Sequence, residues 1–191
     1  MKIGLYFGTF NPIHNGHISV AEFVLKNTDL KKIWFVVSPQ NPLKKNMELL
    51  FDKARLHLVQ LAIEGKPDFK ACDTEFNLPL PSYTINTLDE LKKKFPQNEF
   101  SLIMGSDNLE KFERWKDYEK ILSSYEILVY PRTEKIKTQL TKNAHVKILS
   151  SPLMEISSTD IRKMIEEKKS AKNFLPEKVE KEILLSRFYL K

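Results

Sequence analysis

The chain has 191 residues and a formal net charge of +6, and 41% of its residues are hydrophobic. This size allows one domain with a substantial core, and the composition is ordinary for a soluble globular protein. The longest clearly apolar run, Ile33–Val37, is too short to cross a membrane, and no signal peptide follows Lys2. The lone Cys72 excludes an internal disulfide and a cysteine-based metal site. We therefore expect a cytoplasmic protein with a single domain over residues 1–191, whose part from about residue 157 is helical.

The excess of basic over acidic residues fits an anionic partner, such as nucleic acid or a phosphorylated small molecule. The alternative is that lysine-rich helix faces keep the protein soluble, because runs such as Lys92–Lys94 lie among many glutamates. The ribonucleoprotein aromatic motif and zinc-finger spacing are both absent. We expect no nucleic-acid partner and no membrane partner, and the sequence is compatible with a homo-oligomer.

Apolar runs alternate along the chain with segments of helical periodicity. In chain order the pattern predicts a strand at Ile3–Phe7, a helix at Gly16–Asn27, a strand at Ile33–Ser38, a helix at Asp52–Ile63, a strand at Phe69–Phe76, a helix at Thr84–Lys94, a strand at Phe100–Met104, short helices near Asn108–Phe112 and Asp117–Leu122, strands at Glu126–Tyr130 and Val146–Leu149, and helices at Thr159–Glu167 and Glu177–Leu185. This alternation predicts an α/β fold with a Rossmann-like, doubly wound parallel sheet, helices on both faces and a small C-terminal helical extension. Ligands of such sheets bind at the carboxyl ends of strands. The polar segment 133–143 is expected to be a mobile loop.

The first informative segment, Gly8–His17, joins the first strand to the first helix. Gly8 allows a sharp turn, Pro12 fixes the turn, and Gly16 leaves room for a phosphate. His14 and His17 can point to a common side if the helix begins near Asn15. A helix start offers N–H groups and a positive end, which predicts a phosphate site. The alternatives are a loop with two exposed histidines or a metal-binding pair, and no third ligand is nearby.

A second segment combines three hydroxyl residues, Ser157–Thr159, with Arg162 one turn later. Ser157 and Asp160 have the spacing of a capping box, so one interpretation is an ordinary helix start. The other is a phosphate site, because hydroxyl and N–H groups can hold phosphate oxygens while Arg162 supplies a planar fork.

Other candidates stand at predicted strand ends or in loops. Asp107, after Met104 and Gly105, either binds ribose hydroxyls or caps the next helix. Lys44 either reaches a phosphate or is an ordinary surface lysine, and Trp115 either stacks on a planar ring or packs in the protein.

Together these segments resemble the nucleotidyltransferases with a paired-histidine signature, and most closely the bacterial nicotinate-nucleotide adenylyltransferases. The resemblance runs over nearly the whole chain. It rests on Gly8–His17, Ser38–Pro42, Pro81–Thr84, Met104–Asp107, Trp115, Ile156–Arg162 and Phe174–Pro176.

The resemblance implies transfer of AMP from ATP to nicotinate mononucleotide, which gives nicotinate adenine dinucleotide and pyrophosphate in NAD biosynthesis. It implies catalytic roles for His14, His17, Lys44 and Arg162. It assigns ATP to Gly8, Thr9, Phe10, His14, His17, Gly105, Asp107, Ile156, Ser157, Ser158 and Arg162, and the mononucleotide to Asn11, Lys44, Thr84 and Trp115. ATP phosphates would carry Mg²⁺, with no protein metal site.

The implied chemistry needs no protein nucleophile, because the acceptor phosphate is already an anion. The enzyme must align two phosphates and offset the charge on the leaving pyrophosphate, so we expect His14 and His17 to position the phosphates and stabilise their charge rather than act as general bases.

Relatives commonly have glycine and aspartate where this chain has Phe7 and Asn11. These departures leave open how strictly nicotinate is preferred over nicotinamide. Other acceptors, such as phosphopantetheine, and a non-catalytic nucleotide- or nucleic-acid-binding protein are the alternatives.

Overall fold

The computed structural model describes residues 1–40, 49–133, 135–151 and 156–190. The strands are β1 (Lys2–Gly8), β2 (Lys32–Val37), β3 (Phe69–Cys72), β4 (Glu99–Gly105), β5 (Ile127–Tyr130) and β6 (Val146–Ile148). The α-helices are α1 (Asn15–Asn27), α2 (Asp52–Ile63), α3 (Thr84–Lys94), α4 (Ser106–Leu109), α5 (Tyr118–Ser124), α6 (Ser158–Glu166) and α7 (Glu177–Leu185). Short 3₁₀ helices lie at η1 (Thr74–Asn77), η2 (Phe112–Arg114) and η3 (Gln139–Lys142).

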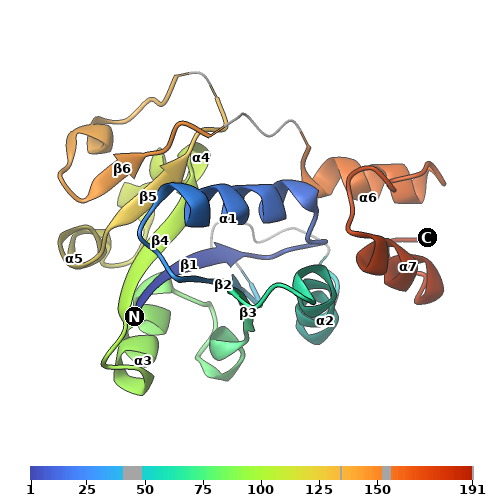
Figure 1. Cartoon of the computed structure of the whole chain (residues 1–191), viewed down its shortest axis with the longest axis horizontal. Coiled ribbons are helices and arrows are strands. Elements are labelled where there is room, and N and C mark those ends of the chain that lie inside the picture. The colour runs from blue at the N-terminus through green and yellow to red at the C-terminus, as the bar shows by residue number, and fades with distance from the viewer. Residues whose placement is uncertain (41–48, 134, 152–155, 191) are drawn as a thin grey trace.

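The strands form one sheet in the order β3-β2-β1-β4-β5-β6, and every neighbouring pair is parallel (Figure 1). This confirms the predicted doubly wound parallel sheet. The central strand β1 pairs on both sides, so that Leu5 lies opposite Trp34 of β2 and Leu102 of β4. The winding reverses between β1 and β4, and at such a point the connections leave in opposite directions and open a crevice at the strand ends.

Side chains of each strand alternate between two hydrophobic clusters, one on each face of the sheet. In β2, Phe35 packs with the cluster on the side of α1, α2, α6 and α7, whereas Trp34 and Val36 pack with the cluster on the side of α3 and α5. A strand buried on both faces reads as a continuous apolar run, which is why Ile33–Val37 was recognisable in the sequence.

Several predicted boundaries differ from the structure. The strand expected at Phe69–Phe76 ends at Cys72, and η1 follows it. This 3₁₀ turn buries Thr74 and Glu75, and the Glu75 carboxyl accepts a hydrogen bond from Thr87 of α3. The short helix near Asn108–Phe112 is two pieces, α4 and η2. Leu149, expected in the last strand, lies just after β6.

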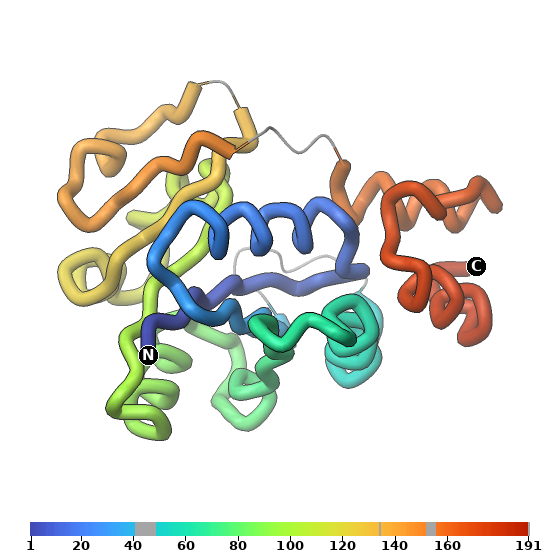
Figure 2. Tube along the Cα trace, in the orientation of Figure 1, coloured from blue at the N-terminus to red at the C-terminus, as the bar shows by residue number. Residues whose placement is uncertain are grey.

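The segment expected to be mobile, residues 133–143, contains η3, whose start is capped by the side chain of Thr138. Its mobility stays a prediction. The two C-terminal helices lie beyond the carboxyl end of β1 (Figure 2), and the N–H of Asn15 donates to the carbonyl of Phe174 at 2.8 Å. This places the C-terminal segment against the start of α1.

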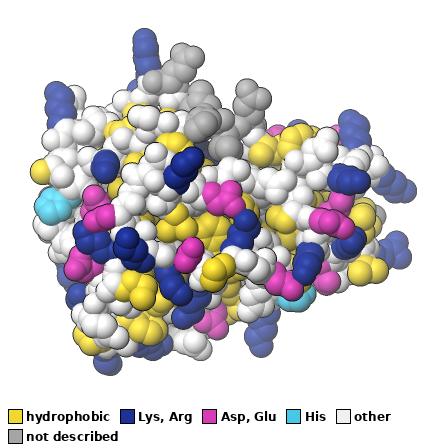
Figure 3. Space-filling model, in the orientation of Figure 1, with side chains coloured by type: hydrophobic (Ala, Val, Ile, Leu, Met, Phe, Trp, Pro, Cys, Tyr) yellow, Lys and Arg dark blue, Asp and Glu magenta, His cyan; other side chains and the backbone are white. Residues whose placement is uncertain are grey.

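The surface carries mixed charges. Basic side chains are spread among acidic ones over the face seen in Figure 3, with no single basic patch there. In the part of the chain that the structure describes, no helix is long and apolar enough to cross a bilayer.

The central position of β4 gives a test of the core. Leu102 is fully buried, and we expect Leu102→Ala to lower the free energy of unfolding by about 2–5 kcal/mol through lost contacts and a cavity. The exposed Leu185 of α7 is the matched control, and Leu185→Ala should change the value by less than about 0.5 kcal/mol. Urea denaturation of both variants measures the difference, and equal losses would contradict this packing.

Candidate active site

The segment after β1 turns back on itself. Phe10 adopts a left-handed backbone conformation with φ of 45°, and its ring packs over Gly8. A Cβ on Gly8 would lie 2.8 Å from that ring, so only glycine allows this return. His14 is the N-cap residue of α1, which begins at Asn15, one residue before the predicted start at Gly16.

The two histidines of the segment are in contact, and their ring centroids are 3.7 Å apart. The backbone N–H of His14 donates to Nδ1 of His17 at 3.2 Å. A nitrogen that accepts cannot carry the ring proton, so neutral His17 has its proton on Nε2. Gly16 serves a different purpose from the expected one, because the space beside its Cα is occupied by the His14 ring, 3.0 Å from a Cβ built there.

His14 is buried, with 4% of its surface exposed. Burial, reinforced by the nearby Arg132 guanidinium, lowers the pKa of His14 to about 4. At neutral pH this ring is therefore uncharged, and it can offer a hydrogen bond but not a positive charge.

The second predicted signature docks onto the first. Ser157 caps α6 and forms the predicted capping box with Asp160. The Ser158 hydroxyl donates to the carbonyl of Pro12 at 2.9 Å, and Nη1 of Arg162 donates to the carbonyl of Asn11 at 2.8 Å. These bonds join segments 146 and 151 residues apart and bring the starts of α1 and α6 to one place.

The two serine hydroxyls therefore already donate within the protein, Ser157 to Asp160 at 2.5 Å and Ser158 to Pro12. The Asp160 N–H is also used, since it donates to Ser157 Oγ at 3.3 Å, so the first-turn N–H groups of α6 that remain suited to an anion are those of Ser158 and Thr159. Arg162 also contacts Thr159 Oγ1 at 3.3 Å, so its guanidinium lies across the start of α6.

Asp107 does not cap a helix. Gly105 is the cap residue of α4, Asp107 lies within the helix's first turn, and its side chain pairs with Nε of Arg132 at 3.3 Å. A Cβ on Gly105 would meet the Asp107 carboxylate and the Arg132 guanidinium, so a larger residue would displace this ion pair.

Sequence reasoning missed Arg132. Its Nη2 donates to the Tyr130 hydroxyl at 3.1 Å, and the Tyr6 hydroxyl donates to the same oxygen at 3.0 Å. A lone arginine in a loop carries no motif, and the one available signal was its place two residues after β5.

These groups line an open space of about 840 Å³, solvent included, which we call the histidine hollow. Its polar lining combines hydrogen-bond donors from β1, α1, α6 and the loop after β5. Its residues are Tyr6, Phe7, Gly8, Thr9, Phe10, His14, His17, Met104, Gly105, Asp107, Asn108, Tyr130, Arg132, Ser157, Ser158, Thr159 and Arg162. Asp107 is the only carboxylate in this set, and the described residues contain no group of three or more potential metal ligands. The hollow thus suits an anion.

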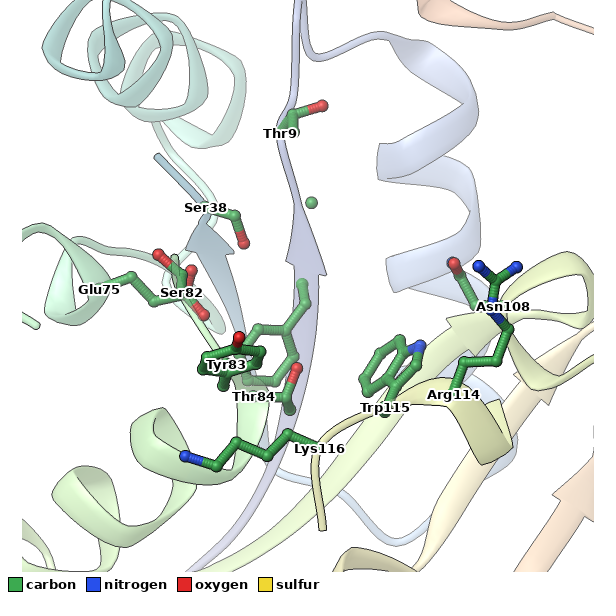
Figure 4. A pocket seen from close by; sticks show the side chains of 12 residues that line it. Thr9, Ser38, Glu75, Ser82, Tyr83, Thr84, Asn108, Arg114, Trp115 and Lys116 are labelled. Carbon is green, nitrogen blue, oxygen red and sulfur yellow. The ribbon is translucent and has the colours of Figure 1, made fainter. Parts of the chain in front are cut away.

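A second space of about 650 Å³, the tryptophan hollow, adjoins the first. Figure 4 shows Ser38, Glu75 and Ser82 on one side of it and Asn108, Arg114 and Trp115 on the other. Its remaining lining residues are Phe7, Gly8, Thr9, Tyr83, Thr84 and Lys116. The hollows share Phe7, Gly8, Thr9 and Asn108, so they meet at the carboxyl end of β1.

Aromatic and polar groups form the walls of the tryptophan hollow. Trp115 packs on Phe112 with ring centroids 5.1 Å apart and borders the hollow. Thr84 is the first residue of α3, and the Lys116 ammonium lies 5.0 Å from the Tyr83 ring centroid. The predicted Trp115 and Thr84 are therefore brought together.

Glu75 is a second residue that the sequence did not single out. It is 2% exposed, and burial raises the pKa of its carboxyl group. One oxygen accepts from the Thr87 hydroxyl at 2.9 Å, and the hydroxyls of Ser38 and Ser82 also lower the pKa of the carboxyl group, against the larger effect of burial. The end of the predicted strand Phe69–Phe76 is thus a 3₁₀ turn that contributes a buried carboxyl group to the tryptophan hollow.

Two predicted mononucleotide contacts stand apart. Asn11 is 1% exposed and borders neither hollow, and its side-chain oxygen accepts from the Tyr189 hydroxyl at 2.9 Å and the Leu50 N–H at 3.2 Å. The Asn11 side chain therefore links the loop after β1 to Tyr189 and Leu50 behind the hollows. Lys44 lies outside the described residues. Ile156, predicted near ATP, lies beside Gly16.

Comparisons with known proteins agree with this geometry. A family model described as cytidylyltransferase-like matches residues 5–164. The chain is 53% identical over 193 residues to the "Probable nicotinate-nucleotide adenylyltransferase" of Flavobacterium psychrophilum, covering 100% of both, and 48% identical to the protein of that name from Bacteroides fragilis, covering 96% of this chain and 91% of that one. A solved structure of Plasmodium falciparum nicotinic acid mononucleotide adenylyltransferase complexed with NaAD has the same fold, with a TM-score of 0.80 at 20% identity, covering 98% and 97% of the two chains.

The burial of His14 gives a test by nuclear magnetic resonance. Because its folded pKa is about 4, below the ordinary 6.5, the ring should stay neutral on acidification and titrate only near pH 4. The unfolded chain binds that proton near pH 6.5, so His14 contributes stability above this pH that is lost as pH falls toward 4. Imidazole titration by nuclear magnetic resonance measures the midpoint of His14 directly. A His14 midpoint near 6.5 would contradict the prediction.

Proposed function

Because the chain belongs to the cytidylyltransferase-like family and to its nicotinate-nucleotide adenylyltransferases, we propose that it transfers AMP from ATP to nicotinate mononucleotide. The products are nicotinate adenine dinucleotide and pyrophosphate, and the step belongs to NAD biosynthesis in the cytoplasm. The observation that carries the proposal is the meeting of two hollows at the end of β1, one rich in anion-binding groups and one walled by an indole ring.

ATP occupies the histidine hollow in this proposal. Its phosphates face His17, Arg162 and the starts of α1 and α6, where N–H groups and the positive helix ends favour anions. Asp107 is placed to accept from a ribose hydroxyl, while Arg132 holds the carboxylate in position. Mg²⁺ arrives with ATP as part of the substrate, coordinated by phosphate oxygens.

The acceptor occupies the tryptophan hollow. Its pyridine ring stacks on Trp115, and its carboxylate lies at Thr84, where the first turn of α3 offers N–H groups and a positive end. The Lys116 ammonium on the same wall favours a carboxylate over an uncharged carboxamide. The phosphate of the mononucleotide then points toward Thr9, where the hollows meet.

The reaction follows from this placement. A phosphate oxygen of the acceptor attacks the α-phosphorus of ATP, a new P–O bond forms, and the bond to the β-phosphate oxygen breaks with its electron pair on pyrophosphate. No protein group has to move a proton. The Nε2–H of His17, the Arg162 guanidinium and neutral His14 offset the charge that grows on the transferring and leaving groups.

An acceptor assay tests the proposal most directly. With ATP and Mg²⁺, we expect pyrophosphate release to be at least about tenfold faster in kcat/KM with nicotinate mononucleotide than with nicotinamide mononucleotide, because one lost charged contact costs more than about 1.4 kcal/mol. Phosphopantetheine should give no release. Equal rates with both mononucleotides would contradict the acid specificity, and ATP binding without turnover on any acceptor would reject the enzyme itself.

His17 offers a test of the transition-state donor. We expect His17→Ala to lower kcat by more than about tenfold while the KM for ATP changes little, because one donor to the growing charge is lost. Steady-state kinetics measure both constants, and His57→Ala, at an exposed position of α2, is the control. Normal turnover of His17→Ala would remove this residue from the mechanism.

A further inference from the structure

Arg55 of α2 is a buried cation behind the site, with 1% of its surface exposed. Its guanidinium donates four hydrogen bonds, all to backbone carbonyls. Nε donates to Leu50 at 2.8 Å, Nη1 to Thr9 at 2.5 Å and Ser38 at 2.8 Å, and Nη2 to Pro39 at 3.0 Å. In the described parts of the chain it forms no ion pair with a carboxylate.

A buried charge without a carboxylate partner is costly, so an apolar side chain of similar length would serve the core better. What the guanidinium offers is geometry. Its planar set of N–H donors reaches carbonyls that point from different directions, which a lysine ammonium cannot match.

The carbonyls come from three separate segments. Thr9 follows β1, Ser38 and Pro39 follow β2, and Leu50 precedes α2. Thr9 borders both hollows. Ser38 borders the tryptophan hollow on the wall opposite Trp115 (Figure 4). Arg55 itself borders neither hollow, so it does not touch a substrate.

We propose that Arg55 is a positioning residue for adenylyl transfer, one that fixes the end of β1, where the phosphates meet, against the end of β2, which walls the acceptor. The inference rests on the proposed function. Aligned reactants lose their rate advantage when displaced by about 1 Å, at a cost of about a hundredfold. Loss of the four Arg55 hydrogen bonds therefore reduces kcat more than it weakens the binding of either substrate alone.

Two substitutions distinguish the effect of the planar guanidinium donors of Arg55 from the effect of its positive charge. Arg55→Lys keeps the positive charge but loses most of the four contacts, and Arg55→Met keeps length without charge. The matched control is Lys53→Met, which removes one exposed positive charge from the first turn of the same helix. For both Arg55 variants we expect kcat to fall at least about tenfold with each KM within about threefold, and Lys53→Met to match the wild type.

A third variant tests the contacts themselves. Arg55→Ala leaves a buried space of guanidinium shape, and added guanidinium ion at concentrations far below denaturing should raise kcat in a saturable manner. Methylammonium at the same ionic strength should not. Rates are expressed per folded enzyme, determined from circular dichroism and thermal unfolding, so that a loss of stability is counted separately.

The outcomes are distinct. Wild-type kcat in Arg55→Lys, or loss of activity that matches the unfolded fraction alone, overturns the proposal. A raised KM for nicotinate mononucleotide with unchanged kcat also overturns it, because that result assigns Arg55 to acceptor binding. If the wild-type protein itself fails to use nicotinate mononucleotide, the proposed function fails instead, whatever the variants do.

Discussion

The reversal of winding between β1 and β4 is the constraint on which the rest of the site depends. Because connections from these neighbours leave toward opposite faces of the sheet, the end of β1 stays open on both sides. Phe7, Gly8 and Thr9 then form a boundary between two hollows rather than the floor of one. A reaction that joins two phosphorylated molecules needs such a boundary, where each phosphate arrives from its own side.

The histidine hollow is completed by hydrogen bonds between distant segments. Arg162 and Ser158 donate to the carbonyls of Asn11 and Pro12, so the start of α6 is held next to the start of α1. Two helix N-termini at one place concentrate positive potential without adding a protonated side chain. The hydroxyls of Ser157 and Ser158 donate within the protein, and the Asp160 N–H donates to Ser157, so the N–H groups of Ser158 and Thr159 remain for an anion.

Buried polar groups set the electrostatics around the boundary. His14 is kept neutral by burial and by Arg132, while Asp107 is held by that same arginine. The Arg55 guanidinium is stabilised by four backbone carbonyls and has no carboxylate partner among the described residues, and burial raises the pKa of Glu75 beside the acceptor wall. These arrangements cost free energy of folding, and such costs are characteristic of functional sites.

The sequence by itself determined the parallel sheet, the helices and the two phosphate-binding signatures, because apolar periodicity, glycine and capping residues act over a few neighbouring positions. It also predicted that His14 and His17 share one side and that Thr84 and Trp115 matter. Only the tertiary structure decided which groups face the hollows. It buried Asn11, brought in Arg132, Arg55 and Glu75, and paired Asp107 instead of letting it cap. Those outcomes depend on contacts between residues far apart in the chain, which no local pattern encodes.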